Sequence, residues 1–457
     1  MQKNILKEAK VIHFIGIGGI GISAIARMML LEGKRVSGSD RDSSKVVDEL
    51  IKAGAAVVIG QKKGNIPADC DLVVYTVAIP EENPEFAEAK RREVKMLSYP
   101  QTLNIISKEK YTIAVSGTHG KTTVTAMIAK IMIDEGLDPT VIVGSLLKNS
   151  SDENMESNFV AGKSKPVRLN GISRPGGYLI VEADEYKKSF HNLEPSILVI
   201  NNIDADHLDF YKDLEDIQNS FLELAKKIPK DGWLICNTKL PSLQTIIKNV
   251  KPARTTGIVQ SGGCQVMDYD AIILKEKLLV PGVHNRQNAK AAIAVAEALG
   301  VSVSKAISSL AKFTGTWRRF EFKGMTKTGA LIYDDYAHNP QKVRAALQGA
   351  RELYPDKRIV VVFQPHLFSR TKLLLNEFAT AFSDADEIIL APIFPAREPF
   401  DATISSEILA EKIGKGAKAF PTFKKIEEYL KINLKAGDVL ITMGAGEQYK
   451  IGEALLV

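Results

Sequence analysis

Short runs of β-branched and other apolar residues alternate with longer amphipathic stretches along the whole chain. This pattern is typical of βαβ units, in which helices cover both faces of a parallel sheet. The sequence therefore predicts an α/β fold with parallel sheets. The expected strands are residues 10–15, 34–38, 72–76, 111–116, 178–183, 197–203, 331–335, 359–364, 387–391 and 438–443. A spacing of three or four between apolar residues predicts a helix over 214–228.

The length and composition indicate several globular domains. The 457 residues exceed one compact core, since a domain averages about 150 residues. A hydrophobic share of 45% and a charged share of 25% are ordinary for a globular protein. The net charge of +6 favours anionic ligands only weakly and argues against a dedicated nucleic-acid surface. We expect no nucleic-acid partner.

Cysteine usage and hydropathy favour a cytoplasmic protein. The three cysteines lie far apart without a CxxC spacing, which predicts neither a disulfide framework nor a zinc cluster. The apolar stretch 11–31 is interrupted by His13, Arg27 and four glycines, and it does not reach the roughly 18 apolar residues of a membrane span. We expect no membrane segment and no secretory signal.

Two breaks divide the chain. Residues 104–111 precede a new strand-loop-helix start, and a Gly-Thr turn within 313–316 precedes another strand. Residues 148–177 are rich in Ser, Asn, Gly and Pro, which predicts a mobile excursion within the middle domain. The predicted domains are residues 1–106, 107–313 and 314–457.

A first glycine-rich loop, GIGGIG at 16–21, lies between an expected strand and an expected helix, and Asp40 closes the next strand. Glycines there allow the backbone to approach phosphates, helix N–H groups face the anion, and an acid about 20 residues on can accept from a ribose hydroxyl. The loop predicts a dinucleotide or another nucleotide diphosphate. A merely tight strand-to-helix turn is the alternative.

A second loop, SGTHGKTT at 116–123, also follows an apolar strand and opens a helix. Its N–H groups would cradle the phosphates of ATP, Lys121 would neutralise charge between the β- and γ-phosphates, and the Thr122 hydroxyl would bind Mg²⁺. The loop is shorter than usual because position 115 is Val. The predicted ATP-binding residues here are Gly117, Thr118, His119, Gly120, Lys121, Thr122 and Thr123.

Both loops belong to an ordered series of motifs that resembles the Mur ligase family. The series continues with EADE at 182–185, NIDADH at 202–207, HNRQNA at 284–289, DDYAHNP at 334–340 and FQPH at 363–366. The resemblance covers essentially the whole chain. It implies an N-terminal Rossmann-like UDP-binding domain, a central P-loop ATPase-type domain with a parallel sheet, and a C-terminal Rossmann-like α/β domain that closes over ATP.

The resemblance implies an ATP-dependent ligase of peptidoglycan precursor synthesis that works through an acyl phosphate. UDP-N-acetylmuramate would supply the carboxylate and L-alanine the amine, with ATP as a substrate, Mg²⁺ as the cofactor, and a monomer or weak homodimer as the assembly. Asn339 and Leu367 stand where the family commonly has His and Arg, so a ligase that adds a peptide or another amino acid stays open. An NAD-dependent dehydrogenase and a non-catalytic nucleotide-binding protein are the alternatives from other classes.

The resemblance also implies roles for individual residues. Lys121, Glu182 and His207 would be catalytic, and Thr122, Glu182 and His207 would bind the metal. For the other carboxylates of these motifs, a solvated group or an indirect partner of the metal is as good an interpretation as a metal ligand. These residues are Asp184, Glu185, Asp204 and Asp206.

The remaining implied contacts are with nucleotides and the amino acid. The adenine-side and phosphate-side residues would be His284, Asn285, Asn288, Arg319 and Asp335, with helix capping open for Asn285. Those on the sugar nucleotide would be Gly18, Gly19 and Gly21 at the pyrophosphate, Ser39 and Asp40 near the uridine, and Thr76 as a further wall. Those on the muramate carboxylate and the amino acid would be Tyr336, His338, His366 and Arg370. We expect His13 to be structural.

Overall fold

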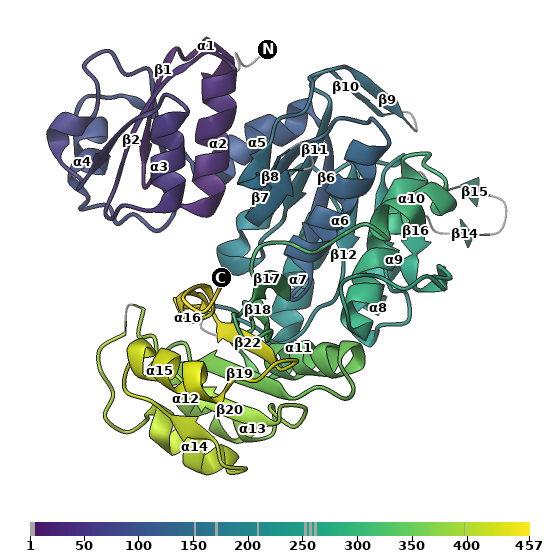
Figure 1. Cartoon of the computed structure of the whole chain (residues 1–457). Coiled ribbons are helices and arrows are strands. Elements are labelled where there is room, and N and C mark those ends of the chain that lie inside the picture. The colour runs from purple at the N-terminus through teal and green to yellow at the C-terminus, as the bar shows by residue number, and fades with distance from the viewer. Residues whose placement is uncertain are drawn as a thin grey trace. The chain divides into compact units, whose positions relative to one another are not determined.

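The computed structural model describes residues 5–149, 152–169, 172–207, 210–250, 254–255, 258–259, 263–396 and 398–457. These residues form large parallel or mostly parallel sheets covered by helices (Figure 1), which confirms the predicted α/β class. The chain divides into two compact units, and the division falls within helix α9 (Val283–Ala298). One unit is Met1–Glu276 with Gln287–Ala311, and the other is Lys277–Arg286 with Lys312–Val457.

The first sheet of the first unit is entirely parallel, in the order β3-β2-β1-β4-β5. Its strands are β1 (Val11–Ile15), β2 (Arg35–Asp40), β3 (Ala56–Ile59), β4 (Leu72–Tyr75) and β5 (Lys95–Ser98). The helices are α1 (Ile5–Glu8), α2 (Ile20–Leu31), α3 (Lys45–Lys52), α4 (Pro84–Arg91) and α5 (Tyr99–Glu109). Because the strand order reverses beside β1, the loop after β1 lies where such sheets bind ligands.

The second sheet has the order β16-β13-β12-β6-β11-β7-β8 and is parallel except for β8. Its strands are β6 (Tyr111–Ser116), β7 (Thr140–Asn149), β8 (Asp152–Val160), β11 (Tyr178–Glu182), β12 (Ile197–Ile200), β13 (Trp233–Cys236) and β16 (Gln265–Asp268). Its helices are α6 (Lys121–Asp134), α7 (Leu214–Ala225), α8 (Gln244–Val250), α9 and α10 (Val303–Leu310). The fully buried β6 lies between β11 and β12, so their carboxyl ends share one edge.

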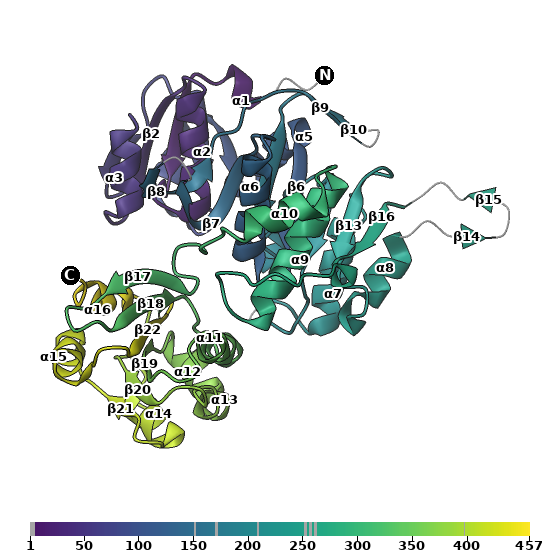
Figure 2. The ribbon, with the colours of Figure 1, turned by 45° about the vertical axis from the view of Figure 1, so that its right-hand side comes forward.

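The prediction of a mobile excursion over 148–177 is wrong for most of the described residues in it. Strand β8 extends the sheet, and β9 (Val167–Leu169) pairs with β10 (Ile172–Arg174). Figure 2 shows β7 and β8 beside α2, which both strands contact. The Ser- and Asn-rich composition is typical of a loop. The prediction is wrong because Asn158 and Phe159 are buried by residues that lie far away in sequence.

The sheet of the second unit has the order β17-β18-β22-β19-β20-β21, with only β17 antiparallel. Its strands are β17 (Glu321–Met325), β18 (Leu331–Asp335), β19 (Ile359–Gln364), β20 (Glu387–Leu390), β21 (Lys418–Ala419) and β22 (Val439–Gly444). Its helices are α11 (Pro340–Leu353), α12 (Phe368–Leu373), α13 (Leu375–Ala379), α14 (Ser406–Ile413), α15 (Phe423–Asn433) and α16 (Tyr449–Glu453). Alternating buried residues of β19 supply separate cores on the two faces.

Short elements complete the described chain: β14 (Arg254–Thr255), β15 (Ile258–Val259), and the 3₁₀ turns η1 (Lys63–Asn65), η2 (Tyr186–Asn192), η3 (Pro241–Leu243) and η4 (Tyr269–Ala271). The helix predicted over 214–228 is present as α7. Within the described ranges, none of the helices combines the length and apolar character needed to cross a bilayer.

Candidate active site

The loop after β6 leads directly into α6. Gly117 and Gly120 have φ angles of +132° and +84°, a backbone conformation that L side chains rarely adopt. Gly120 stands at the N-cap of α6 without a side chain to accept from the first turn, and that turn carries no acidic residue. Its N–H groups therefore suit an anion such as a phosphate.

Two asparagines after β12 support this loop from the neighbouring strand. Asn202 accepts from the Thr118 N–H through its backbone carbonyl (3.1 Å) and from the His119 N–H through its side chain (2.7 Å). The Asn201 amide donates to the His119 carbonyl (3.0 Å) and to Asn288 Oδ1 (2.9 Å). Sequence analysis did not assign this role to Asn201 and Asn202, although a polar pair directly after a buried strand was a visible signal.

Asn288 packs against the loop between β6 and α6. Its side chain is buried, and a Cβ on Gly120 would meet both its carbonyl oxygen and the Asn201 amide. The structure thus gives Asn288 a supporting role beneath the loop. The adenine contact predicted for Asn288 stays a prediction.

Lys121 points into the loop. Its ammonium donates to the Gly117 carbonyl (2.7 Å) and to both oxygens of the Glu185 carboxylate (2.8 and 3.0 Å). The Glu185 side chain is only 3% exposed, and His207 Nε2 lies 3.7 Å from its Oε1. A phosphate that entered the loop would meet a cation already fixed in place.

The proposed metal ligands follow three adjacent strands. Thr122 is in the first turn of α6 after β6, Glu182 ends β11, and His207 follows β12. Ligand atoms of Asp184, Glu185 and His207 all lie within 4.8 Å of one another. The two carboxylates offer the hard oxygen donors that Mg²⁺ prefers, and His207 offers a nitrogen. The structure therefore adds Asp184 and Glu185 as neighbours of His207.

Glu182 has a defined orientation. Its Oε1 accepts from the Gly144 N–H at 2.9 Å, and a Cβ on Gly144 would lie 2.8 Å from its other oxygen. A glycine at this point of β7 therefore leaves the carboxylate room to lie across the end of the sheet.

The first glycine loop is held by β2. The N–H groups of Gly16 and Ile17 donate to the Ser39 carbonyl (2.8 and 3.0 Å), and the Gly18 N–H donates to Asp40 Oδ2 (2.8 Å). Gly19 is the N-cap of α2, whose first turn again carries no acidic residue. Asp40 is therefore adjacent to Gly18, and its contact with the uridine stays a prediction.

Thr76 borders the same loop, whereas Gly21 does not face it. A Cβ on Gly16 would lie 2.6 Å from Thr76 Cγ2. A Cβ on Gly21 would lie 2.6 Å from the ring and hydroxyl of Tyr99. Close packing against Tyr99 explains why position 21 is glycine, and the approach of Gly21 to the pyrophosphate stays a prediction.

Ser39 is also placed differently from the prediction. Its side chain is buried and donates to Glu85 Oε2 (2.6 Å), so it does not present a hydroxyl near a uridine. Glu85 is fully buried, yet hydrogen bonds from His13, Ser39 and Asn65 outweigh the cost of burial and lower the pKa of its carboxyl. His13 belongs to this buried network, which confirms its structural role.

In the second unit, Asp335 is largely committed to the backbone. Its carboxylate accepts from the N–H groups of Phe320 and Ala337, each at 2.7 Å. Burial raises the pKa of Asp335, while the Arg319 guanidinium and these hydrogen bonds oppose the increase. Arg319 stacks over Tyr336, with its guanidinium carbon 5.2 Å from the ring centre.

His284 and Asn285 differ in exposure. His284 is exposed, and its ring lies against the space that a Cβ on Gly282 would fill. Asn285 is buried and its amide donates to the Pro281 carbonyl at 2.7 Å. This bond is not helix capping, the open alternative for Asn285, because a capping side chain accepts from a backbone N–H whereas Asn285 donates to a carbonyl. The predicted adenine-side contact of Asn285 stays a prediction.

The four residues predicted for the carboxylate and the amino acid cluster at the ends of β18 and β19. Arg370 lies 3.2 Å from His366 Nδ1, and the rings of His338 and His366 are 6.1 Å apart. His338 Nδ1 donates to the Tyr336 carbonyl (2.8 Å). Burial lowers the pKa of both imidazoles, and for His338 by a large amount, so both are neutral at pH 7. Phe394, which the prediction omitted, stacks on His366.

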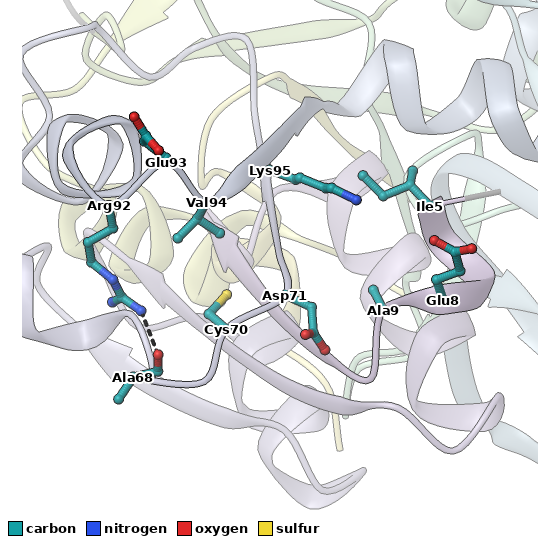
Figure 3. A pocket seen from close by; sticks show the side chains of 10 residues that line it. All are labelled: Ile5, Glu8, Ala9, Ala68, Cys70, Asp71, Arg92, Glu93, Val94 and Lys95. Carbon is teal, nitrogen blue, oxygen red and sulfur yellow. Dashed lines mark hydrogen bonds between the residues drawn. The ribbon is translucent and has the colours of Figure 1, made fainter. Parts of the chain in front are cut away.

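A cavity of about 630 Å³ lies outside these sites. It is lined by residues that include Cys70, Asp71, Arg92 and Lys95, at the amino ends of β1, β4 and β5 (Figure 3). Arg92 and Asp71 are committed to the backbone, because Arg92 donates to the Ala68 carbonyl and Asp71 accepts from the Val11 N–H. None of the predicted site residues lines this cavity, which lies at the end of the sheet opposite the glycine loop.

Comparison with known proteins identifies the family. Three family models match: "Mur ligase family, catalytic domain" at residues 11–111, "Mur ligase middle domain" at 115–296 and "Mur ligase, glutamate ligase domain" at 318–446. A UDP-N-acetylmuramate–L-alanine ligase of Clostridium kluyveri is 43% identical over the full length of both chains. The chain belongs to the Mur ligase family. It is accordingly an ATP-dependent ligase that forms an amide bond.

Other Mur ligases agree over nearly the whole chain. A UDP-N-acetylmuramate–L-alanine ligase of Lachnospira eligens is 43% identical over 97% of both chains. The crystal structure of the UDP-N-acetylmuramate-alanine ligase of Thermotoga maritima covers 98% of both chains with a TM-score of 0.77 and 27% identity. A murein peptide ligase of Psychrobacter arcticus, at 24% identity and a TM-score of 0.67, shares the fold over 98% of both chains. These neighbours confirm the predicted three-domain α/β architecture.

In this Mur ligase, one of the two departures from the family pattern, Asn339, has a local explanation, and nothing in the structure explains the other, Leu367. Asn339 is the N-cap of α11, where its side chain accepts from the Lys342 N–H at 2.9 Å. Leu367 precedes α12 with a φ of +72°.

Buried Arg318, not predicted as a site residue, donates to Asp334 and to the carbonyls of Gly444 and Gly446.

Proposed function

We propose that this Mur ligase joins L-alanine to the carboxylate of UDP-N-acetylmuramate while ATP is converted to ADP and phosphate. The observation that carries the proposal is the 43% identity over the full length of both chains to a UDP-N-acetylmuramate–L-alanine ligase. The chemistry of the site is compatible with this reaction, since the first unit has two glycine loops, each leading into a helix N-terminus that suits an anion.

The reaction needs two steps because a carboxylate is a poor electrophile. A carboxylate oxygen first attacks the γ-phosphorus of ATP, the bond to ADP breaks, and an acyl phosphate forms. The amine nitrogen then attacks the acyl carbon, the carbon–oxygen bond to phosphate breaks, and the nitrogen loses a proton as the amide forms. Charge must be neutralised in both steps.

We assign ATP binding to residues 117–123. The N–H groups at the start of α6 would receive the phosphates, and Lys121 would place its positive charge between the β- and γ-phosphates. Its contacts with Gly117 and Glu185 support this role because they fix the ammonium inside the loop. Nucleotide contacts of His284, Arg319 and Asp335 stay part of the proposal.

Thr122, Glu182 and His207 would hold Mg²⁺, with Asp184 and Glu185 beside them. The support is the position of all three residues at or after the carboxyl ends of adjacent strands, together with the grouping of His207 with Asp184 and Glu185. The bound cation would supply positive charge next to the phosphates.

The first glycine loop would bind the sugar nucleotide through Gly18, Gly19, Asp40 and Thr76. The cluster of Tyr336, His338, His366 and Arg370 would bind the carboxylate and the amino acid. Neutral imidazoles suit this task since they can accept or donate without adding charge beside Arg370.

Several broader assignments complete the proposal. We place the domain boundaries near residues 106 and 314. We also propose that the protein is cytoplasmic and that it is a monomer or a weak homodimer. Cys70, Cys236 and Cys264 form no disulfide within the described residues, which is compatible with a reducing compartment.

The test is phosphate release with UDP-N-acetylmuramate, ATP and a panel of amines. We expect release that requires both the sugar nucleotide and an amine, with the highest kcat/KM for L-alanine over glycine, L-serine and an alanyl peptide. A higher kcat/KM for the peptide would reject the proposed amino acid. A fluorescence titration with NADH tests the dehydrogenase alternative, and we expect no change.

A further inference from the structure

The first turn of α2 is attached to the central sheet by one buried side chain. The Asn158 amide, on β8, donates to the Ile20 carbonyl and to Ser23 Oγ (2.8 Å). Asn158 and Ser23 are both fully buried. Since Ile20 begins α2, this contact joins β8 to the helix that follows the first glycine loop.

Tyr99 contacts the same turn from α5. A Cβ on Gly21 would lie 2.6 Å from the Tyr99 hydroxyl oxygen and 2.6 Å from Cζ, so the absence of a side chain at Gly21 lets the ring lie against the helix. Burial raises the pKa of the Tyr99 hydroxyl, and the carboxylates of Glu182 and Asp184 raise it further. Tyr99 therefore lies against α2, and its helix α5 contacts β6 of the central sheet.

The turn that Asn158 and Tyr99 hold is continuous with the glycine loop. The Ser23 N–H donates to the Gly19 carbonyl (2.9 Å), and the Gly18 N–H donates to Asp40 (2.8 Å). The loop and the start of α2 thus form one hydrogen-bonded segment. A displacement of the turn would displace the loop with it.

The Asn158 contact is not the arrangement that stability alone would favour. Among the described residues, Asn158 Oδ1 is buried without a hydrogen-bond partner. A buried polar atom in that state is unfavourable, and an apolar side chain could fill the space without the penalty. An apolar residue would not supply the amide N–H groups of Asn158, and these groups fix the position of α2.

We propose that Asn158 and Tyr99 are positioning residues that fix the first glycine loop relative to the metal-binding end of the central sheet. They would set the distance between the bound sugar nucleotide and the phosphoryl group of ATP, and they need touch neither substrate. The inference rests on the proposed function, because it assigns the sugar nucleotide to this loop.

The main test compares Asn158→Ala and Asn158→Asp with wild type. Aspartate keeps the shape of asparagine, but as a carboxylate it cannot donate to the Ile20 carbonyl. We expect kcat to fall at least tenfold in both variants. The dissociation constants of ADP and of UDP-N-acetylmuramate, measured by calorimetry, should change less than threefold, because the two loops themselves are intact.

Asn104→Ala is the matched control. The Asn104 amide donates to the Asn192 carbonyl (2.6 Å) and so also ties α5 to the central part of the chain; among the described contacts this hydrogen bond does not involve α2, which α5 meets through Tyr99. We expect this variant to keep kcat within twofold of wild type. Tyr99→Phe, which keeps the ring against Gly21, should lower kcat less than Asn158→Ala does.

The results separate positioning from folding and from substrate identity. An unchanged kcat in Asn158→Asp, or an equal loss of kcat in Asn104→Ala, would overturn the inference. So would a loss that appears only as weaker binding of one nucleotide. If wild type prefers another amine, the proposed substrate fails, and the same variants measured with that amine still decide the positioning role.

Discussion

At the scale of single residues, the charge of Lys121 is the most consequential feature of the ATP loop. The Lys121 side chain is only 17% exposed, and its ammonium is hydrogen-bonded to Glu185 and Gly117. The contacts keep the cation within the loop before a phosphate arrives, so little reorganisation is required on binding.

We predict that Lys121→Ala abolishes phosphate release, with a fall in kcat of at least about 100-fold, because the positive charge that Lys121 would place at the transferred phosphoryl group is lost. The affinity for UDP-N-acetylmuramate should be unchanged. Lys130→Ala is the matched control on the same helix; it removes a Lys130–Asp134 pair (2.7 Å) worth about 0.5 kcal/mol and should leave kcat intact.

Removal of Lys121 also leaves the buried Glu185 carboxylate without its cation, so lost folding has to be separated from lost catalysis. We expect the double variant Lys121→Ala with Glu185→Gln to regain thermal stability but not activity. Activity that returned with stability would refute the assigned role of Lys121.

At the scale of elements, the glycine loop and α6 depend on a tight fit between neighbouring strand ends. The loop is short, and Asn201 and Asn202 occupy the space beside it. The helix can present its free N–H groups only while this support keeps the loop backbone in place.

We predict that Gly120→Ala lowers the affinity for ADP at least tenfold, because the new Cβ would displace the amides of Asn201 and Asn288. Gly136→Ala is the matched control at the other end of α6. Gly136 also has a positive φ (+72°) but nothing within 4 Å of the new Cβ. It should cost about 1 kcal/mol of stability and leave ADP binding unchanged. Calorimetric titration of both variants measures the difference, and equal affinities would contradict the prediction.

At the scale of the whole molecule, the two units carry different kinds of group. The first unit contains both glycine loops, whereas the second contains the imidazole cluster of His338 and His366. Burial of neutral imidazoles links the stability of the second unit to pH.

We predict that His338 makes the protein less stable as the pH falls below about 6.5. The folded pKa of His338 is well below the ordinary value because of burial and the nearby cations Lys342, Arg370 and Arg319. Between the two pKa values the unfolded chain therefore binds a proton at His338 that the folded chain does not bind. This contribution to the free energy of unfolding is fully present above the unfolded pKa and decreases as the pH falls toward the folded pKa. The loss is roughly 1 kcal/mol per pH unit in that window.

Urea unfolding of wild type and His338→Gln at pH 5.5 and 7.5 tests this. The decrease in the free energy of unfolding between the two pH values should be smaller in the variant, which has no imidazole to protonate. Equal decreases in both proteins would show that His338 does not carry the effect. The comparison cancels the titration of the other groups.

The sequence by itself determined the α/β class, the expected strands, the two loops and the order of motifs along the chain. These are local properties: strand and helix periodicity, and the glycine spacing that a strand-to-helix turn needs, are set by neighbouring residues. Lys121 and Gly120 were assigned for that reason. The family was recognisable because its motifs occur in a fixed order.

Only the tertiary structure decided what surrounds each motif. Ser39 faces buried Glu85, Gly21 packs on Tyr99, Asn288 supports the ATP loop, and the Asn-rich strand β8 covers α2. The sequence could not reveal these contacts, because each joins residues at least 46 positions apart, and which polar side chains become buried depends on how the sheets and helices pack.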